Sequence, residues 1–407
     1  MPDKRIRLLM ITNSLPLPSS DFLKDKVIGL SDMFDLHLLC WDTTSNKAKF
    51  IRKYPGVNKK NIHVYPNQKG FANQLWVLLT HLILVLTNPS KYIRLFRSIQ
   101  RNSTGIKKAI HDFVAYAPMV QIKPDIVHFE FGTLAATFRD IKDYFQVKVS
   151  SSFRGYDLNY VALDRPDYYT KVWSSFDGYH FLGNDLRSRA VKRGYRHNRF
   201  EALISPAIDT SLFQPEEKKA SEKLIIISTG RLVWKKGYEY GIRAVARLKE
   251  KGIPFEYRII GDGEHLQAIQ FTIYELGLEH DVILLGKKNK TEIKKLLSEG
   301  DVFLHPAISE GFCNAVLEAQ AMGLPVVTTD ADGLSENIMN GITGFVVPKW
   351  DVAAMADKLE WCAGHPAEAQ AMGRKGIERI ASEFRLEDQL DQFRNFYQKL
   401  YYGADNG

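Results

Sequence analysis

Cysteine and long apolar runs are both scarce in this chain of 407 residues. Its 3 cysteines, Cys40, Cys313 and Cys362, lie far apart and show no CxxC spacing, which indicates neither a disulfide framework nor a zinc site. We therefore expect a protein of the reducing cytoplasm. The most apolar window, residues 75–86, is shorter than the roughly twenty residues that a membrane-spanning helix needs. This window is expected to form a core helix or an interfacial helix.

Acidic residues are missing from a long stretch of the first half, because none occurs between Asp42 and Asp112. Residues 1–200 carry 31 Lys and Arg against 16 Asp and Glu, whereas the remainder carries 24 against 31. Around the apolar window the cations are Lys47, Lys49, Arg52, Lys53, Lys59, Lys60, Lys69, Lys91, Arg94, Arg97, Arg101, Lys107 and Lys108. Apolar surface flanked by cations is typical of segments that rest on an anionic leaflet. A solvated basic face beside a buried helix would give the same pattern.

Nucleic acid is not expected as a partner of this basic half. The sequence has no helix-turn-helix, no zinc-finger spacing and no aromatic and basic strand signature of an RNA-binding sheet. The charge imbalance therefore points to a membrane surface or another polyanion rather than to DNA or RNA.

Short apolar runs alternate with helical segments along the whole chain. The predicted strands are 6–12, 36–39, 126–129, 147–151 and 179–182 in the first half, and 224–228, 257–260, 282–285, 302–305, 326–328 and 345–347 in the second. The clearest predicted helices are 238–250, 264–276, 290–299, 314–322, 352–363, 366–380 and 386–401. Runs of this kind suit parallel sheets that are covered on both faces, so we predict an α/β fold.

Two prolines, Pro206 and Pro215, and the charges that follow them predict a linker between two domains. We expect Rossmann-like domains at 1–205 and 223–384, a linker at 206–222, and a C-terminal helix at 385–407 that packs back on the first domain. Ligands bind at the carboxyl edges of such parallel sheets. Two doubly wound domains facing each other across a cleft would therefore place the active site in that cleft.

The segment 309–325 is the most informative part of the sequence. Glu310 and Gly311 follow a predicted strand, a helix begins at Asn314, and Glu318 lies two helical turns further on. The free amides of a helix N-terminus can hold an anion. Two glutamates at this spacing also occur by chance in helices, but the strand before them and the turn after them support one strand–turn–helix–turn–strand unit. This unit suits a phosphorylated sugar.

Two further loops follow predicted strands of the second domain. Arg231 and Lys236 lie in a turn that begins at Gly230, where a guanidinium and an ammonium would neutralise a diphosphate leaving group. Taken alone, they could equally be two exposed basic residues. Gly261 and Gly263 open the next helix and allow a nucleotide to approach the backbone closely. The GxGxxG fingerprint of dinucleotide sites is incomplete here.

These motifs together resemble glycosyltransferase family 4, the retaining enzymes of GT-B fold. The resemblance rests on the second domain. Its motifs there are Gly230-Arg231, Lys236-Gly237, Gly261-Asp262-Gly263, Leu285-Gly286, Ser309-Glu310-Gly311-Phe312, Glu318-Ala319, Gly323-Leu324-Pro325-Val326-Val327, Gly341 and Gly344. Residues 13–22 and 124–129 of the first domain are more loosely similar to members that build bacterial exopolysaccharide or capsule. It implies transfer of a sugar from a UDP- or GDP-sugar to a hydroxyl of a glycan or polyprenyl-linked glycan, at the inner membrane face.

The resemblance also implies roles for the matched residues. Arg231, Lys236 and Glu310 would act on the reacting groups: the two cations on the diphosphate and the carboxylate on the sugar hydroxyls. Glu318 would bind the ribose hydroxyls. The full set of donor-binding residues implied is Gly230, Arg231, Lys236, Gly261, Gly263, Glu310, Gly311, Phe312, Cys313 and Glu318.

The acceptor side is less well defined. Its candidates are Ser20, His128, Glu130, Arg154 and Asp157, each of which could instead be a turn-capping or strand-end residue. Many family members carry a histidine where this chain has Arg154, which cannot act as a base. Arg154 could bind the donor phosphates or an anionic acceptor, while the leaving phosphate helps to deprotonate the acceptor.

No metal or other cofactor is expected. Asp330 and Asp332 mimic a manganese-binding DxD motif, but turn chemistry explains them better. Two other functions fit the same motifs: an epimerase that acts on the nucleotide sugar itself, and a protein that binds the nucleotide sugar without consuming it.

Overall fold

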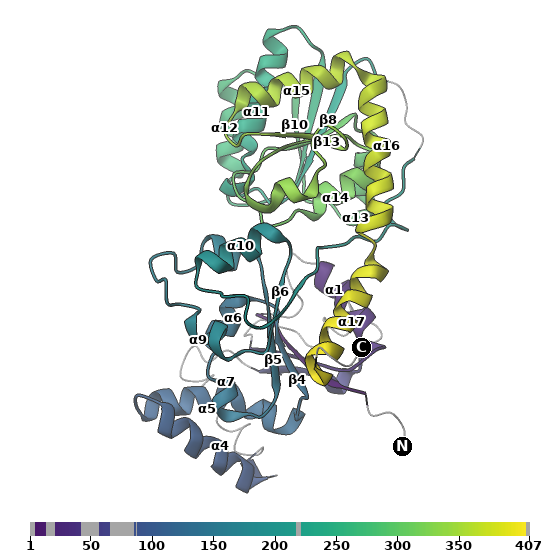
Figure 1. The fold of residues 1–407 in the computed structure, drawn as a ribbon. Helices are drawn as coiled ribbons and strands as arrows, with labels where there is room; N and C mark the ends of the chain where they lie inside the picture. Colours follow the sequence, from purple (N-terminus) through teal and green to yellow (C-terminus); the bar gives the residue numbers. More distant parts are fainter. Residues whose placement is uncertain are drawn as a thin grey trace. The chain divides into compact units, whose positions relative to one another are not determined.

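The computed structural model describes residues 5–13, 21–41, 57–65, 85–86, 88–216 and 221–403. The chain forms two compact domains (Figure 1). The first comprises Met1–Phe181, Arg187–Ile204 and Leu390–Gly407, and the second comprises Leu182–Leu186 and Ser205–Gln389. Several predictions fall outside the described residues, namely those for Ser20, for residues 75–84 of the apolar window, and for the cations Lys47, Lys49, Arg52, Lys53 and Lys69.

A parallel sheet forms the centre of the first domain. Its described strands run in the order β3-β2-β1-β4-β5-β6-β7. They are β1 (Arg7–Ile11), β2 (Asp35–Trp41), β3 (Ile62–Tyr65), β4 (Ile126–Phe129), β5 (Lys148–Phe153), β6 (Gly178–Phe181) and β7 (Phe200–Leu203). Leu8 pairs with Leu36 on one side and with Ile126 on the other, so β1 and β4 are neighbours at the point where the strand order reverses.

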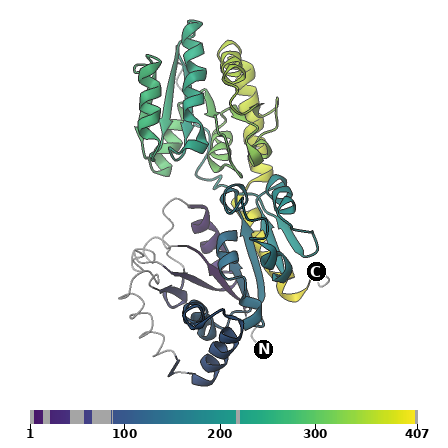
Figure 2. The same cartoon turned by 90° about the vertical axis from the view of Figure 1, so that its left-hand side faces the viewer.

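Helices cover this sheet. They are α1 (Asp21–Ser31), α4 (Pro89–Asn102), α5 (Ile106–Ile122), α6 (Gly132–Thr137), α7 (Ile141–Tyr144), α8 (Gly155–Asn159), α9 (Thr170–Ser175), α10 (Asn184–Lys192) and α17 (Leu386–Tyr402), with the short η1 (Lys59–Asn61). Phe393, Phe396 and Tyr397 of α17 are buried in the same core as Leu8 and Leu38. The C-terminal helix is therefore an integral part of the first domain. Helices α4 and α5 pack side by side (Figure 2).

The second domain has its own parallel sheet, with the described strands in the order β10-β9-β8-β11-β12-β13. They are β8 (Leu224–Thr229), β9 (Phe255–Ile260), β10 (Val282–Gly286), β11 (Val302–His305), β12 (Val326–Thr329) and β13 (Gly344–Val347). β8 and β11 are both buried along their whole length, which explains their continuous apolar sequence. The strand order reverses between them.

Helices lie on both faces of this second sheet (Figures 1 and 2). They are α11 (Tyr238–Glu250), α12 (Leu266–Glu275), α13 (Lys290–Ser298), α14 (Asn314–Ala321), α15 (Val352–Gly364) and α16 (Pro366–Glu383), with η2 (Trp234–Lys236) and η3 (Asp332–Asn337). Helices α11, α12 and α15 pack against one another or the sheet on one face, and α14 packs against α16 on the other. The predicted doubly wound α/β architecture is confirmed.

The sequence prediction missed two strands, β3 and β7. Both lie at an edge of the first sheet, where β3 pairs with β2 and β7 pairs with β6. Each has only four residues and is partly exposed, with His63 and Glu201 among them. An edge strand does not need a continuous apolar run, so its sequence resembles that of a loop. Across the described residues, none of the helices combines the length and apolar character needed to cross a bilayer.

Candidate donor site

The loops after β8 and β11 meet at the reversal of strand order in the second domain. The amides of Ile308 and Ser309 donate to the Lys235 carbonyl oxygen, at 2.8 and 3.2 Å. The glycine at position 237 follows η2 with a φ of 63°, and a Cβ there would lie 2.2 Å from the Pro306 carbonyl oxygen. Only glycine allows this close approach of the two loops. Such a reversal point is where open α/β sheets bind their ligands.

An ion pair between Lys236 and Glu310 forms the centre of the site. Lys236 Nζ donates a hydrogen bond to Glu310 Oε2, and the two side chains are only 12% and 13% exposed. Burial by itself would lower the pKa of Lys236, but the nearby Cys313 and Glu310 outweigh it and raise that pKa. Arg231 is close enough for its charge to act on Lys236 in the opposite direction. The structure therefore brings together the three residues predicted to act on the reacting groups.

Two buried side chains, His305 and Cys313, lie behind this pair. Cys313 Sγ is 3.4 Å from His305 Nε2 and 4.0 Å from Lys236 Nζ. Burial raises the pKa of the Cys313 thiol to about 11, and burial followed by the Lys236 charge holds the pKa of His305 well below its usual value. Both groups are thus neutral at neutral pH. Cys313 acts on Lys236 as an anion only once its thiol ionises at higher pH, so Glu310 is the anion that faces Lys236 at neutral pH.

The same side chains form a set of potential metal ligands. The ligand atoms of His305, Glu310 and Cys313 lie within 4.8 Å of one another, and these are the atom types that bind zinc. Lys236 already supplies a positive charge at this point. That no metal takes part stays a prediction. Asp330 and Asp332 have other hydrogen-bond partners than this set. The Asp330 carboxylate accepts from the Lys349 amide, and the Asp332 carboxylate accepts from the Ser309 hydroxyl.

The glycines of the two other predicted loops pack backbone against backbone. The Gly230 amide donates to the Ile260 carbonyl oxygen at 3.0 Å, and the Leu232 amide donates to the Asp262 carbonyl oxygen at 3.0 Å. A Cβ at Gly261 would lie 1.9 Å from the Gly230 carbonyl oxygen. These glycines are therefore explained by close packing of two loops, and their contact with a nucleotide stays a prediction.

Replacing Gly261 with alanine is expected to lower the free energy of unfolding by more than about 1 kcal/mol. The reason is that Gly261 combines a φ of 155° with the 1.9 Å approach of its Cβ position to backbone. Gly277→Ala is the matched control, because Gly277 also has a positive φ, of 61°, but has no atom within 4 Å of its Cβ position. Urea unfolding of both variants measures the difference. Equal losses would show that the close approach costs nothing.

The loop from Glu310 to Asn314 is held by a residue that the sequence did not reveal. The Asn337 side chain is buried and accepts from the Cys313 amide at 3.2 Å while donating to the Cys313 carbonyl oxygen at 3.0 Å. The Phe312 ring packs on Phe384 at 5.9 Å between centroids. The Cys313 amide is thus engaged within the protein, and Glu318 follows on the first turns of α14. A lone asparagine at the end of a short helix carries no spacing signal, which is why it was missed.

A buried hydroxyl also lies at this site. Tyr238 begins α11 and is 1% exposed, and its hydroxyl has no hydrogen-bond partner among the described residues. A Cβ at Gly230 would lie 3.0 Å from that hydroxyl. Tyr238 therefore places an unused donor next to the loop that carries Arg231, a feature with no sequence signal because buried tyrosines are common.

In the first domain, Glu130 lies directly after β4, at the reversal of strand order. Its buried carboxylate accepts from Lys26 Nζ at 2.7 Å and from the Arg154 guanidinium at 3.0 Å. Burial alone would raise the pKa of Glu130, but the two cations outweigh it and hold that pKa below its usual value. Burial lowers the pKa of Lys26 to about 8. Lys26 is a partner of this acceptor-side group that the sequence prediction missed.

The other two described acceptor-side candidates have hydrogen-bond partners within the first domain, and their contact with an acceptor stays a prediction. His128 is buried and its ring nitrogens lie 2.9 Å from the hydroxyls of Ser150 and Ser152. The Asp157 carboxylate accepts from the amides of Arg154 and Thr133, at 2.9 and 3.0 Å, and so holds two loops together. Burial raises the pKa of Asp157. Both residues support Arg154 and Glu130 from within the domain.

Comparison with known proteins supports the class of enzyme that this site suggests. Residues 209–379 match the family model described as glycosyl transferases group 1. The chain is 34% identical over 279 residues to a protein of Salmonella typhimurium named as colanic acid biosynthesis glycosyltransferase WcaL, covering 64% of this chain and 67% of that one. It is 28% identical to the amylovoran biosynthesis glycosyltransferase AmsK of Erwinia amylovora, covering 97% of this chain and 100% of that one. The chain belongs to the group 1 glycosyltransferases and is itself a glycosyltransferase.

The fold has a counterpart among solved structures. The Anabaena protein Alr3699/HepE, solved in complex with UDP and glucose, superimposes with a TM-score of 0.74 over 97% of this chain and 99% of that one, at 14% identity. At this identity the likeness shows the fold. The two parallel α/β domains are those of the GT-B class, as the sequence resemblance implied.

Proposed function

We propose that this glycosyltransferase moves a hexose from a UDP- or GDP-sugar to a hydroxyl of a glycan or polyprenyl-linked glycan during synthesis of a bacterial surface polysaccharide. The observation that carries the proposal is the buried Lys236–Glu310 pair beside Arg231 at the reversal of strand order. The names of the two relatives support a polysaccharide product. The solved complex of a protein with the same fold supports a UDP-sugar donor.

The proposed chemistry follows from the charges. The bond between the sugar C1 and the donor diphosphate breaks, a bond from C1 to the acceptor oxygen forms, and the acceptor proton passes to the departing diphosphate. The negative charge that develops on the diphosphate is stabilised by Lys236 and Arg231. Glu310 keeps Lys236 charged and in place. The second carboxylate oxygen of Glu310 can accept a hydrogen bond from a hydroxyl of the sugar. We propose that the anomeric configuration is retained.

The experiment that tests the reaction is a screen of UDP- and GDP-sugars with the purified full chain, with and without a glycan acceptor. We expect release of nucleoside diphosphate together with formation of a new glycosidic bond. NMR of the product should show that this bond has the same anomeric configuration as the donor. Conversion of the nucleotide sugar to an isomer without acceptor would show an epimerase. Binding of nucleotide sugar without any turnover would show a binding-only protein.

Glu318→Gln is expected to raise the KM for the donor about tenfold and to leave kcat nearly unchanged, because it weakens binding of the ribose in ground and transition state alike. The matched control is Glu275→Gln, an exposed glutamate at the end of α12. Steady-state kinetics with varied donor measure both. A fall in kcat at unchanged KM would assign Glu318 to the chemical step and contradict the ribose role.

We also propose that the enzyme works at the cytoplasmic face of the inner membrane, where a polyprenyl-linked acceptor would be presented. Support comes from the excess of Lys and Arg in the first half and from α4, which carries no acidic residue. Arg154, fixed by Glu130, is the proposed contact for a phosphate of the acceptor.

A further inference from the structure

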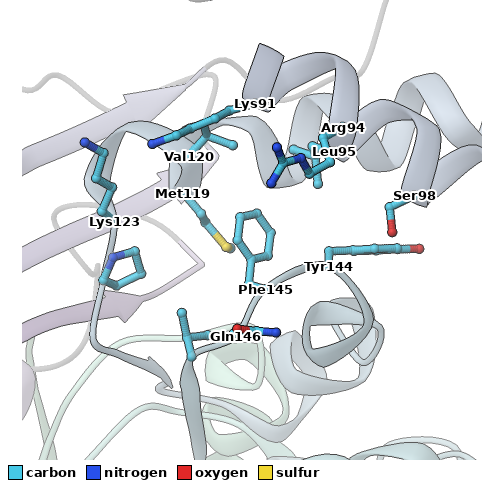
Figure 3. Close-up of a pocket in the computed structure, with 12 residues that line it drawn as sticks. Lys91, Arg94, Leu95, Ser98, Met119, Val120, Lys123, Tyr144, Phe145 and Gln146 are labelled. Carbon is cyan, nitrogen blue, oxygen red and sulfur yellow. The ribbon is translucent and has the colours of Figure 1, made fainter. Parts of the chain in front are cut away.

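A cavity of about 450 Å³ lies in the first domain between α4, the end of α5 and the segment after α7. Lys91, Arg94 and Lys123 stand at its rim, and Met119 and Phe145 lie between them (Figure 3). In this view the Lys91 side chain extends toward Lys123. The cavity thus has a cationic rim above an apolar floor.

In the described part of the chain, no negative charge compensates the rim. None of the lining residues is acidic, and within the described ranges none of the three cations forms an ion pair. The one acidic residue of α5, Asp112, pairs with Lys108 at 2.5 Å. Three neighbouring cations repel one another. An anion that enters the cavity relieves this repulsion.

The backbone holds one of these cations at the rim. Lys123 ends α5 with a φ of 49°, a left-handed conformation that residues other than glycine rarely adopt. Its amide donates to the Met119 carbonyl oxygen at 3.0 Å, so the turn that carries Lys123 is closed over the apolar floor. The backbone position of Lys123 is therefore set by the end of the helix.

The floor of the cavity is apolar, whereas a site for free phosphate would not need an apolar floor. Met119 and Leu95 are buried, and Phe145 is half-buried. On the same helix pair, Ile93 and Ile106 are 48% and 55% exposed. A molecule with a phosphate next to hydrocarbon would meet both parts of this surface.

The cationic surface continues along α4. A second cavity of about 630 Å³ shares Arg94 and Ser98 with the first and is also lined by Arg97 and Arg101. A row of four cations on one helix without any acid matches the negative charge of an anionic leaflet rather than that of a single ion.

We propose that the cavity between α4 and α5 binds the phosphate headgroup of an anionic phospholipid, with Lys91, Arg94 and Lys123 on the phosphate and the glycerol and acyl chain on Met119, Leu95 and Phe145. The proposal specifies the leaflet location that forms part of the proposed function. It is independent of the transfer reaction, because none of these residues belongs to the donor site.

The test compares two variants of the full chain that lose the same charge. Lys91→Gln with Arg94→Gln and Lys123→Gln removes the rim. Lys192→Gln with Arg196→Gln and Arg199→Gln removes three exposed cations elsewhere in the first domain. Binding is measured by co-sedimentation with vesicles of phosphatidylcholine alone and of phosphatidylcholine mixed equally with phosphatidylglycerol. Circular dichroism and donor hydrolysis confirm that each variant is folded.

The unaltered protein is expected to bind the mixed vesicles and not the neutral ones. Each cation near an anionic surface strengthens binding about fivefold, so loss of the rim should weaken it on the order of 100-fold. The control variant should lose much less affinity for the mixed vesicles than the rim variant does. Equal losses in the two variants, displacement of the protein from vesicles by millimolar inorganic phosphate, or tighter binding to an RNA duplex would each overturn the proposal.

Failure of the reaction is distinguishable from failure of this site. Vesicle binding that depends on the rim, in a protein that consumes no nucleotide sugar, would overturn the proposed function and leave the lipid site standing. Donor hydrolysis without rim-dependent vesicle binding would do the reverse.

Discussion

Lys236→Ala is expected to lower kcat/KM for sugar transfer by about 10²- to 10³-fold, the loss that follows removal of one preorganised donor to a developing negative charge. Lys236 is held by Glu310 inside a site where both side chains are nearly buried, so its charge acts through little intervening water. Water cannot replace a fixed ammonium at this position. Steady-state transfer and donor hydrolysis, measured with saturating acceptor, give the effect.

Glu310→Ala is expected to lower kcat/KM by a similar factor. In the double variant, the loss of transition-state stabilisation should be much smaller than the sum of the losses in the two single variants, because each residue acts through the other. Lys249→Ala is the matched control. Lys249 lies in the last turn of α11 and pairs with Asp281 at 2.8 Å, on an exposed surface. A transfer rate that stays within a few-fold of the original in Lys236→Ala would show that the donor diphosphate is bound elsewhere.

Lys26→Met is expected to lower the free energy of unfolding by about 3 kcal/mol, because it leaves the buried Glu130 carboxylate with Arg154 as its remaining cationic partner. The methionine fills most of the volume of the lysine stem, so the loss reports the missing charge rather than a cavity. Lys26 Nζ also lies 3.9 Å from the Phe393 ring centroid, which adds a lost cation–π contact. Urea unfolding followed by circular dichroism measures the change.

The control for this second prediction is Lys24→Met on the same helix. Lys24 is half-buried and forms no ion pair in the part of the chain that the structure describes. It should change stability by less than about 0.5 kcal/mol. If Lys26→Met were equally neutral, the Glu130–Arg154 pair would be self-sufficient and Lys26 would have no part in holding Arg154.

The pattern of the second domain was readable from the sequence because local interactions determine it. Leu224 to Thr229 is buried on both faces of the sheet and therefore reads as one apolar run. Helix α11 begins and ends at the residues predicted, and α14 starts at the predicted Asn314. Glu310 was placed correctly in the loop after a strand for the same reason. These are features of a few consecutive residues and need no knowledge of the rest of the chain.

Partnerships between distant residues were not readable. Lys236 and Glu310 are separated by 74 positions, and Lys26 and Glu130 by 104. Nothing in the spacing of such residues shows which charge meets which, since that depends on the order in which strands lie in a sheet. Asn337 and Tyr238 were missed because a buried amide or hydroxyl looks like any other in a sequence.

By itself, then, the sequence determined the α/β class, the family and the loops that carry Arg231, Lys236 and Glu310, because strand, turn and helix signals and short motifs are local. The tertiary structure decided the rest. It joined Lys236 to Glu310 by placing β8 beside β11, it joined Lys26 to Glu130, and it set Lys91, Arg94 and Lys123 around one cavity. These outcomes depend on which elements pack together, and packing is a property of the whole chain.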